Sequence, residues 1–371
     1  MNPGLIVRLR PAGPWRSGPD SGARNRVDPI YHSDSLYAAV TSAMTTFGLR
    51  DGWLDATVRS AVPAVRFSSC FPFQGETSFI VPPRSIWPPM GAVSAGKTRW
   101  KSARFVPLRL VAAMLSGQPP REDDWTMDGA SQCLAPAGEA GPFRTNLRWN
   151  AAVDRLNGNA ERHSTACIEF RRDAGLWAVA SFADDDAQAH WLELVRGAFR
   201  LLADTGFGGE RSRGWGRSAQ PEFVEGMLPD LVLAEPEPAP EPAPEPVEAA
   251  PEVEGTEQAV EVKEPETASS VPAMPAATAH WLLSLFTPGP DDAVDWKRGN
   301  YTVLARGGRV DSPAGFGERK KQLQMVTEGS VLVAGETIRG AAPDVAPEGF
   351  AHPVFRAGFA LSIPLRAQVS A

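Results

Sequence analysis

Hydrophobic residues between positions 187 and 204 recur with the spacing of an amphipathic helix. The apolar positions are Trp191, Leu194, Val195, Ala198, Phe199, Leu201 and Leu202. They fall near i, i+3, i+4, i+7 and i+8, so they line one face of a helix. A similar stripe from Leu36 to Phe47 predicts another helix. We expect Ser33 to cap the start of that helix with its hydroxyl.

Short apolar or alternating segments predict the strands of the same region. They cover residues 5–10, 65–73, 77–82, 178–182 and 220–224. With the two helices they give the order β-α-β-β-α-β, interrupted by long insertions. This order is the ferredoxin-like plan, which the RNA-recognition fold shares. The sequence therefore predicts an α+β, ferredoxin-like (RRM-like) domain.

The segment directly after the 187–204 helix is rich in glycine, arginine and aromatic residues. It consists of Gly206, Phe207, Gly208, Gly209, Glu210, Arg211, Ser212, Arg213, Gly214, Trp215, Gly216 and Arg217. Glycine permits positive φ and close approach of another backbone, while exposed N–H groups and arginine forks suit phosphates. Phe207 and Trp215 offer ring faces on which bases stack. The segment predicts nucleic-acid binding; the alternative is a glycine-rich surface loop without a ligand.

Two common nucleotide-binding loops do not fit this segment. The dinucleotide fingerprint G-x-G-x-x-G lies between a strand and the helix that follows it. Here Gly206 and Gly208 fit, but Arg211 occupies the third glycine position and the helix comes first. A P-loop ends in Gly-Lys-Ser/Thr, whereas Gly214 is followed by Trp215. We therefore expect neither type of nucleotide site.

A Glu-Pro segment marks the sharpest change in composition. Residues 235–267 carry eleven glutamates and one lysine, interspersed with proline. Proline disfavours helix and sheet, glutamates repel one another, and few side chains can form a core. We predict a disordered, partly polyproline II linker over 234–277, between an N-terminal domain (1–233) and a C-terminal domain (278–371). A solvated spacer is a simpler role for it than a mimic of nucleic acid.

The Glu-Pro segment also hides the charge of the remaining chain. The net charge is −7, and removing the −10 of residues 235–267 leaves +3. A slightly basic folded part is compatible with nucleic-acid binding.

The sequence also bears on compartment and metal binding. No apolar run reaches membrane-spanning length, and the first residues lack the basic and apolar regions of a signal peptide. Cys70, Cys133 and Cys167 are odd in number and far apart, which argues against disulfides and a zinc site. We expect a cytoplasmic protein without membrane contact, metal or cofactor.

The C-terminal region contains strand-like runs and few helical signals. The runs are 280–286, 302–305, 330–333 and 359–365. We expect a smaller, β-rich, ferredoxin-like second domain. Because so short a region buries little surface alone, we expect it to pack against the first domain. The linker would then be a looped-out insertion.

Candidate catalytic residues are scattered. The histidines are His32, His163, His190, His280 and His352, and no H-E-x-x-H motif is present. His32, Ser33 and Asp34 are adjacent at a helix start and cannot face one another as a triad. His163 or His32 could act as general acid or base in a metal-independent ribonuclease, but His163 has no obvious partner. The acidic triplet 184–186 precedes a helix, whose dipole it complements.

Basic residues are the stronger candidates for a binding role. Residues 91–104 place Lys97, Arg99, Lys101 and Arg104 around Trp100. Charge combined with an aromatic ring is typical of surfaces that follow a nucleic-acid backbone; a solvated hairpin is the alternative. Asp154 and Arg155 form either a structural ion pair or part of a phosphate site.

Six segments in order resemble one family. They are 32–39, 68–83, 101–108, 153–158, 204–216, and a C-terminal block of 329–331 with 352–360. The chain resembles the RAMP superfamily of CRISPR RNA-binding proteins, whose signature is a glycine-rich loop after the second helix of a ferredoxin-like domain. Within it, the chain is similar to the Cas-five-like group and its subunit-four family of the type III-A Csm complex. The Glu-Pro segment departs from the family pattern.

The resemblance implies a non-catalytic subunit of an antiviral ribonucleoprotein. Such subunits bind the 5′ repeat-derived tag of the CRISPR guide RNA, cap the filament of backbone RAMP subunits and dock the large polymerase-like subunit, so that they meet target RNA only indirectly. Residues 206–217 would hold the tag, with His32, Ser33 and Asp34 nearby. A thumb hairpin would project at or near residues 91–104.

Other interpretations remain open. The expected RNA-binding residues also include Lys97, Arg99, Lys101, Arg104 and Arg155.

The first alternative function is a RAMP endoribonuclease that processes precursor RNA, or the capping subunit of another type III complex. A protein-only scaffold with a structural glycine loop is a third possibility.

Overall fold

The first strand of the chain lies inside the main sheet. The computed structural model describes residues 2–18, 22–89, 100–118, 120–153, 156–233, 277–312 and 315–365. The sheet order is β11 (Glu222–Leu228), β1 (Asn2–Leu9), β10 (Ala174–Phe182), β3 (Phe71–Gln74), β4 (Thr77–Ile80) and β5 (Val106–Pro107), and β2 (Val65–Phe67) also pairs with β10. These pairings are antiparallel.

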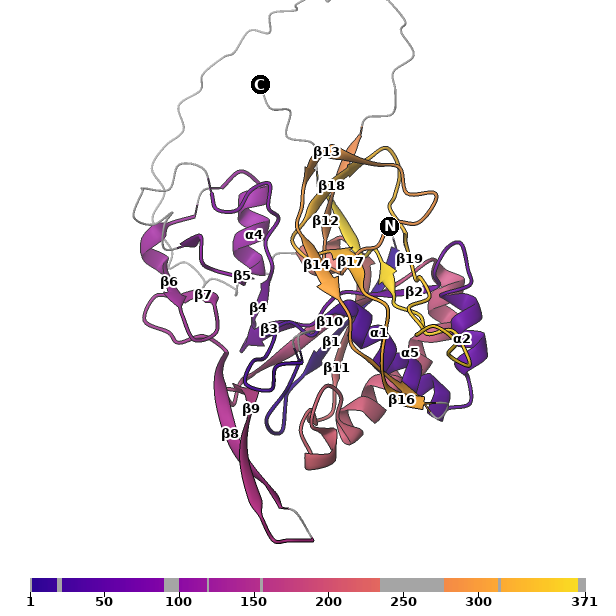
Figure 1. Ribbon diagram of the computed structural model, residues 1–371. Coiled ribbons are helices and arrows are strands. Elements are labelled where there is room, and N and C mark those ends of the chain that lie inside the picture. The colour runs from indigo at the N-terminus through magenta and orange to yellow at the C-terminus, as the bar shows by residue number, and fades with distance from the viewer. Residues whose placement is uncertain are drawn as a thin grey trace, which may run out of the picture. The chain divides into compact units, whose positions relative to one another are not determined.

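Helices α1 (Ser33–Thr46) and α5 (Asp185–Thr205) pack against each other beside this sheet (Figure 1). The short helix α2 (Arg50–Ala56) adds Trp53, whose ring centroid lies 5.2 Å from that of Trp191 on α5. Phe67 of β2 packs on Phe199 of α5 at 6.2 Å. The apolar stripe of α5 is thus buried against aromatic residues from the sheet and from α2.

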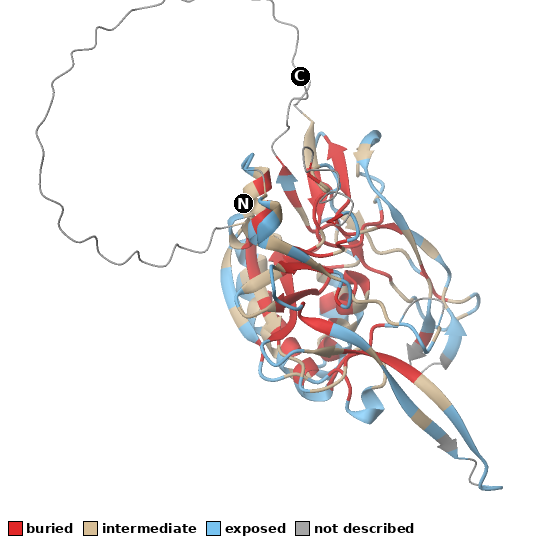
Figure 2. Cartoon of the chain, turned by 90° about the vertical axis from the view of Figure 1, so that its left-hand side faces the viewer, coloured by how far each residue is buried: buried red, intermediate tan, exposed pale blue. Residues whose placement is uncertain are grey.

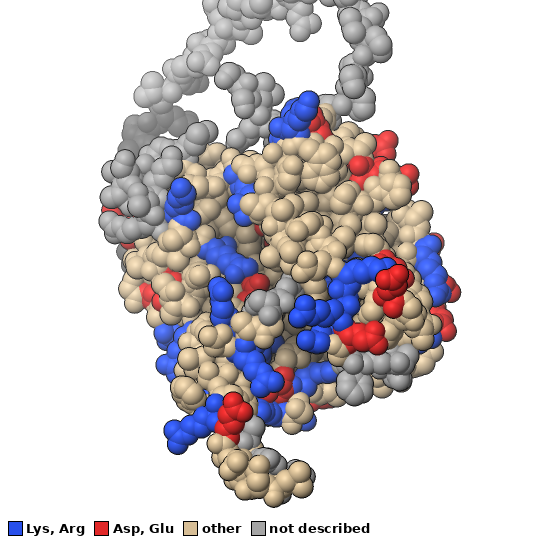
Figure 3. All heavy atoms as spheres, in the orientation of Figure 1, with Lys and Arg blue, Asp and Glu red and all other residues tan. Residues whose placement is uncertain are grey.

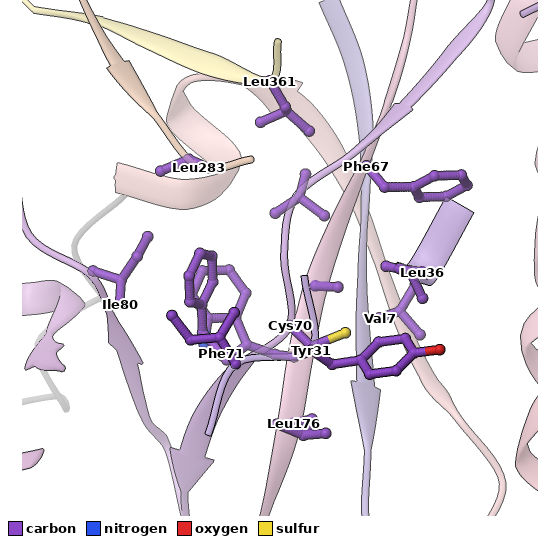
Figure 4. Packing of buried hydrophobic residues seen from close by; sticks show 14 of the residues in the cluster. Val7, Tyr31, Leu36, Phe67, Cys70, Phe71, Ile80, Leu176, Leu283 and Leu361 are labelled. Carbon is purple, nitrogen blue, oxygen red and sulfur yellow. The ribbon is translucent and has the colours of Figure 1, made fainter. Parts of the chain in front are cut away.

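One hydrophobic core joins the two sides of the Glu-Pro segment. It contains Val7, Phe67 and Phe71 of the main sheet together with Leu283 and Leu361 of the C-terminal region. Figure 4 shows these side chains close together. Every residue of β10 is buried, as expected for a strand with apolar layers on both faces. Residues 2–233 and 277–365 belong to one compact unit.

The C-terminal region is built from antiparallel strands. Its four-stranded sheet has the order β13 (Val294–Asn300), β18 (Val331–Ala334), β12 (Thr278–Leu282) and β21 (Ser362–Leu365). Three further pairs are β14 (Val303–Arg306) with β17 (Leu323–Val326), β15 (Arg309–Ser312) with β16 (Gly315–Arg319), and β19 (Gly340–Ala341) with β20 (Gly358–Phe359). No helix occurs among residues 277–312 and 315–365.

A long β-hairpin projects from the N-terminal part. Its strands are β8 (Phe143–Val153) and β9 (Ala160–Phe170), and its far end is largely exposed (Figure 2). Smaller elements precede it: helix α4 (Leu108–Leu115), the 3₁₀ turn η1 (Glu122–Asp124), and strands β6 (Trp125–Asp128) and β7 (Cys133–Pro136). Within the described residues, the projecting hairpin is formed by residues 143–170, whereas residues 91–99 of the segment where the thumb was expected lie outside the described residues.

The mixed α/β architecture with antiparallel sheets confirms the coarse prediction. Both long helices occur where the apolar periodicity placed them, and the Asp184 side chain caps α5 by accepting from the N–H of Ala187 at 2.8 Å. The expected capping role of Ser33 is wrong, because His32 occupies the N-cap position and Ser33 already lies inside α1. The predicted linker lies outside the described residues. Among the described residues, no helix is long and apolar enough to cross a membrane.

Candidate nucleic-acid interface

The glycine-rich loop starts where α5 ends. Gly206 has φ +80°, and its N–H donates to the carbonyl of Leu202 at 2.9 Å. A Cβ added at Gly206 would lie 2.6 Å from the carbonyl oxygen of Trp215, and one at Gly216 would lie 2.1 Å from that of Phe207. The two ends of the loop thus approach so closely that only glycine fits, which confirms the close backbone approach expected from the sequence.

The loop also rests on the segment that follows β1. The N–H of Gly209 donates to the carbonyl of Arg16 at 2.8 Å, and the N–H of Gly216 donates to that of Pro14 at 3.0 Å. The Arg217 carbonyl accepts from the N–H of Ala12 at 2.9 Å. These backbone hydrogen bonds fix the loop against residues 12–16.

The aromatic residues of the loop point inward. Phe207 is 2% exposed and Trp215 is 8% exposed. The Phe207 ring contacts Trp15 at 4.4 Å and Tyr31 at 5.0 Å between centroids, both edge-to-face. The expectation that Phe207 and Trp215 present ring faces to bases is therefore wrong, since packing in the core occupies them. Their role is to anchor the loop.

The polar residues of the loop face solvent. Arg211, Ser212, Arg213 and Arg217 are exposed. Residues Arg211–Arg213 form the 3₁₀ turn η2, which follows Glu210 in the left-handed region at φ +61°. Glu210 forms an ion pair with Arg213 at 3.2 Å. The loop therefore presents arginine side chains on a rigid turn, an arrangement suited to phosphate oxygens.

His32, Ser33 and Asp34 are buried at the start of α1, each at most 5% exposed. His32 Nδ1 lies 2.8 Å from Glu328, and Nε2 lies 3.1 Å from Asp28. Burial alone would lower the pKa of His32, but the two carboxylates outweigh it and raise the pKa to about 9. Both ring nitrogens are thus committed to carboxylates.

The other two residues of this tripeptide also contact the C-terminal region. Ser33 Oγ accepts from the N–H of Leu285 at 2.9 Å. Asp34 forms ion pairs with Arg306 and Arg356. Burial would raise the pKa of Asp34, yet the two guanidinium groups hold it well below the usual range. The tripeptide therefore joins α1 to the C-terminal region, and its contact with RNA stays a prediction.

The basic segment near residue 100 is only partly described. Lys97, Arg99 and Arg155 lie outside the described residues. Lys101 is exposed, and Arg104 forms an ion pair with Asp28 at 3.0 Å. The ring of Trp100 is 3% exposed and stacks on Trp87 at 5.9 Å. The exposed aromatic that the sequence suggested for this segment is therefore absent at Trp100, because its ring is part of the core.

A cavity that the sequence did not predict lies beside the hairpin base. Its volume is about 590 Å³, and its walls include residues 11–14 with Arg144, Arg148 and Arg171. Ala12 and Pro14 also contact the glycine-rich loop. Arg144 and Arg148 both pair with Glu169 across the hairpin. In the sequence, the only indication was the spacing of Arg144 and Arg148 along one strand. The hairpin brings both side chains to the cavity.

Basic side chains are numerous on the face shown in Figure 3. Lys and Arg gather in a band across the middle of this face, with acidic side chains in smaller groups among them. Among the described residues, no group of three or more His, Cys, Asp or Glu side chains is placed to hold a metal ion. His163, half-buried on β9, stands opposite Asn150 of β8.

Part of the chain matches a known protein family. Residues 276–365 match the family model of the CRISPR Csm4 C-terminal domain. A curated relative, the CRISPR system Cms protein Csm4 of Thermococcus onnurineus (strain NA1), is 22% identical over 221 residues, which is 57% of this chain. The match spans 65% of that relative's length.

Solved structures show the same fold along nearly the whole chain. A chain of the Csm3–Csm4 subcomplex of the type III-A CRISPR-Cas interference complex is 13% identical with a TM-score of 0.58, covering 98% of this chain and 99% of that chain. A chain of a Csm1–Csm4 cassette in complex with cA4 is 15% identical with a TM-score of 0.54, covering 98% of each. The C-terminal part of the chain, residues 276–365, therefore matches the Csm4 C-terminal domain family, and the fold of nearly the whole chain is similar to that of chains in the Csm3–Csm4 and Csm1–Csm4 structures.

Proposed function

We propose that this chain is the guide-RNA-capping subunit of a type III-A Csm complex. In this role it holds the 5′ repeat-derived tag of the CRISPR RNA and catalyses no reaction itself. It contacts the large polymerase-like subunit and the neighbouring backbone RAMP subunit, and it meets target RNA only through the guide. The complex acts in the cytoplasm in antiviral defence.

The sheet order supports a ferredoxin-like RAMP domain as the RNA-binding part. In that plan, four antiparallel strands alternate with two helices. Here β1, β2 with β3, β10 and β11 supply the strands, and α1 and α5 supply the helices. The glycine-rich loop then connects the second helix to the last strand. The C-terminal sheet is the smaller second domain.

The geometry of the glycine-rich loop carries the proposal. Its backbone is fixed by Gly206, Gly208 and Gly216, where an added Cβ would clash with backbone atoms, and by the buried Phe207 anchor. The exposed arginines Arg211, Arg213 and Arg217 therefore project from a preformed turn, and little flexibility is lost when they bind phosphates. The cavity with Arg144 and Arg148 continues this basic surface toward the hairpin.

The β8–β9 hairpin fits the thumb of this proposal. Its length lets it reach beyond the body of the subunit (Figure 1). On β8, Leu147, Trp149 and Val153 are exposed apolar residues at alternate positions, so they share one face. Such a face suits contact with a base of the guide or with the neighbouring backbone subunit.

The double variant Arg211→Ala/Arg213→Ala tests the proposal. We expect affinity for a tag-containing guide RNA to fall at least about 10-fold in complexes assembled with the large and backbone subunits. Because two phosphate contacts are lost, the slope of log affinity against log salt should decrease by about 1.4. Unchanged RNA loading and an unchanged salt slope would contradict the proposal.

A matched control removes two other exposed arginines. Arg50 is the first residue of α2 and Arg59 follows the helix; they pair with Asp51 and Asp55, respectively. Helix α2 contacts α5 at Trp191, about 20 Å along the helix from Gly206. The variant Arg50→Ala/Arg59→Ala should therefore keep RNA binding and its salt dependence.

The geometry gives the endoribonuclease alternative little support. His32 is buried with both ring nitrogens on carboxylates, so it is not free to take a proton from RNA. A cleavage assay on repeat RNA with the purified chain decides the matter for His163. If the chain cleaves the RNA and His163→Ala loses this activity, the endoribonuclease function would replace the capping proposal.

A further inference from the structure

A second cavity lies at the other end of the main sheet, away from the glycine-rich loop. Its volume is about 450 Å³, and Asn2 and Leu228 line it. These two residues are register partners at one end of the β1–β11 pair, whereas Arg8 and Glu222 are partners at the loop end. Asn2 and Arg8 are six residue steps apart along β1, about 20 Å. The cavity is therefore distinct from the proposed tag site.

Arg66 lies in the wall of this cavity because of strand alternation. On β2, Phe67 packs toward the helices, so Arg66 points to the opposite face. That face meets the C-terminal region, where Arg66 Nη1 donates to the carbonyl of Ala360 at 3.3 Å. Ser181 stands directly opposite Arg66 on β10 and also lines the cavity.

Within the described residues, the guanidinium of Arg66 forms no ion pair with an acidic side chain. The residue is 7% exposed, and its Nε is buried without a hydrogen-bond partner among the described residues. Burial and the nearby charge of Arg339 lower the pKa of Arg66. Glu336 also lines the cavity, but it is exposed and forms no ion pair with Arg66 within the described chain. A buried charge without a partner costs several kcal/mol, so charges in protein interiors are normally paired.

His280 offers a second unused group. It lies on β12, is 5% exposed, and its Nε2 is buried without a partner in the described part of the chain. Its Nδ1 lies 3.5 Å from Ser362 Oγ, a contact at the limit of hydrogen bonding. Burial lowers the pKa of His280, outweighing the opposing effect of the Glu336 backbone, and so favours the neutral ring.

Hydroxyl groups surround these two side chains. The cavity wall includes Ser181, Thr278, Thr337 and Ser362. A planar carboxylate is satisfied by one guanidinium fork, whereas a tetrahedral oxyanion has further oxygens that accept hydrogen bonds from hydroxyl and imidazole groups. The donor set therefore suits phosphate better than carboxylate.

We propose that this cavity binds a phosphate group, either inorganic phosphate or the phosphate of a small phosphomonoester, between Arg66 and His280. Arg66 supplies the counter-charge, and the imidazole and hydroxyl groups bind the remaining oxygens. Arg66 comes from the N-terminal sheet and His280 from the C-terminal sheet. A bound phosphate thus joins the two regions and stabilises the folded chain.

Thermal unfolding of the full chain tests this site. We expect inorganic phosphate at about 100 times its Kd to raise Tm by roughly 3 to 8 °C relative to sodium chloride at equal ionic strength. Glutamate should give no comparable rise. A small phosphomonoester that raises Tm at lower concentration than inorganic phosphate would identify the natural source. No saturable response to either phosphate source would overturn the proposal.

The variant Arg66→Leu assigns the response to this cavity. It should abolish the phosphate-dependent rise, while its Tm in chloride stays equal to or above that of the wild type, because an uncompensated buried charge has been removed. Arg211→Ala/Arg213→Ala should retain the full rise, which separates this site from the tag site. If Arg66→Leu does not fold, His280→Asn replaces it and should weaken phosphate binding, measured by equilibrium dialysis. A full phosphate-dependent rise in the Tm of either folded variant would overturn the assignment. An Arg66-dependent rise in Tm with tag RNA, without any rise with phosphate, would also overturn it.

Discussion

Asp34, the second residue of α1, forms a buried ion pair with Arg306, which lies 272 positions further along the chain. Arg306 Nε lies 3.1 Å from Asp34 Oδ2, and Nη2 lies 2.9 Å from Oδ1, so the contact is bidentate. Arg356 donates to the same carboxylate. One acidic side chain of the N-terminal region therefore holds two arginines of the C-terminal region.

Replacing Asp34 should destabilise the whole chain. In Asp34→Asn, Arg306 and Arg356 stay buried without their counter-charge, and we expect a loss of about 3 to 5 kcal/mol in the free energy of unfolding. Urea unfolding followed by tryptophan fluorescence measures it. Asp55→Asn is the control, because its ion pair with Arg59 is exposed, and it should lose much less. Equal losses in the two variants would contradict the structural role of Asp34.

The buried His32 should make stability depend on pH above neutrality. Its pKa is raised to about 9 in the folded chain, against about 6.5 when unfolded. The protonated ring therefore stabilises the fold fully below pH 6.5, and this contribution declines until pH 9, by on the order of 3 kcal/mol. Unfolding in urea between pH 6 and pH 10 measures the decline.

The His32→Gln variant provides the control for that pH series. It should be less stable than the wild type at pH 6 and should lack the decline between pH 6.5 and pH 9. His163→Gln, a half-buried histidine on the hairpin, should retain the wild-type profile. A decline that persists in His32→Gln would assign it to another group.

The helices and the close approach of the glycine loop were predictable because they depend on local spacing. The stripe from Trp191 to Leu202 fixes the buried face of α5, and the glycines at 206 and 216 indicate positive φ or crowding. Which way a side chain points depends instead on distant partners. Phe207 is a core residue because its ring packs against Trp15 and Tyr31. The sequence of the loop alone does not predict that contact.

The role of the 32–34 tripeptide was hidden for the same reason. Adjacent polar residues at a helix start indicate capping or solvent exposure, but their partners Glu328, Arg306 and Arg356 lie beyond the Glu-Pro segment. Arg66 and His280, which line the second cavity, likewise come from strands on either side of the Glu-Pro segment. Contacts of such sequence separation follow only from the folded arrangement.

Two glycines of the loop should respond differently to alanine. Gly214 and Gly216 both have φ near +80°, but a Cβ at Gly214 meets no atom within 4 Å, whereas one at Gly216 would lie 2.1 Å from the Phe207 carbonyl oxygen. Gly214→Ala should cost only the strain of the left-handed region, about 1 to 2 kcal/mol. Gly216→Ala should cost more, displace the loop and abolish tag binding. Thermal unfolding and RNA-binding assays compare the two, and equal effects would refute the crowding argument.

Trp149 should matter for assembly and not for folding. It is 72% exposed on β8 of the projecting hairpin, so Trp149→Ala removes few internal contacts and should change the free energy of unfolding by no more than about 0.5 kcal/mol. An exposed tryptophan is a strong candidate for a binding hot spot, where truncation costs about 2 kcal/mol or more. We therefore expect the affinity of the variant for guide RNA or for the backbone subunit to fall roughly 30-fold, measured by co-purification.

The control is Val62→Ala, which changes an exposed apolar residue outside the hairpin and should leave assembly unchanged. Normal assembly of a correctly folded Trp149→Ala complex would exclude this residue from the proposed interface.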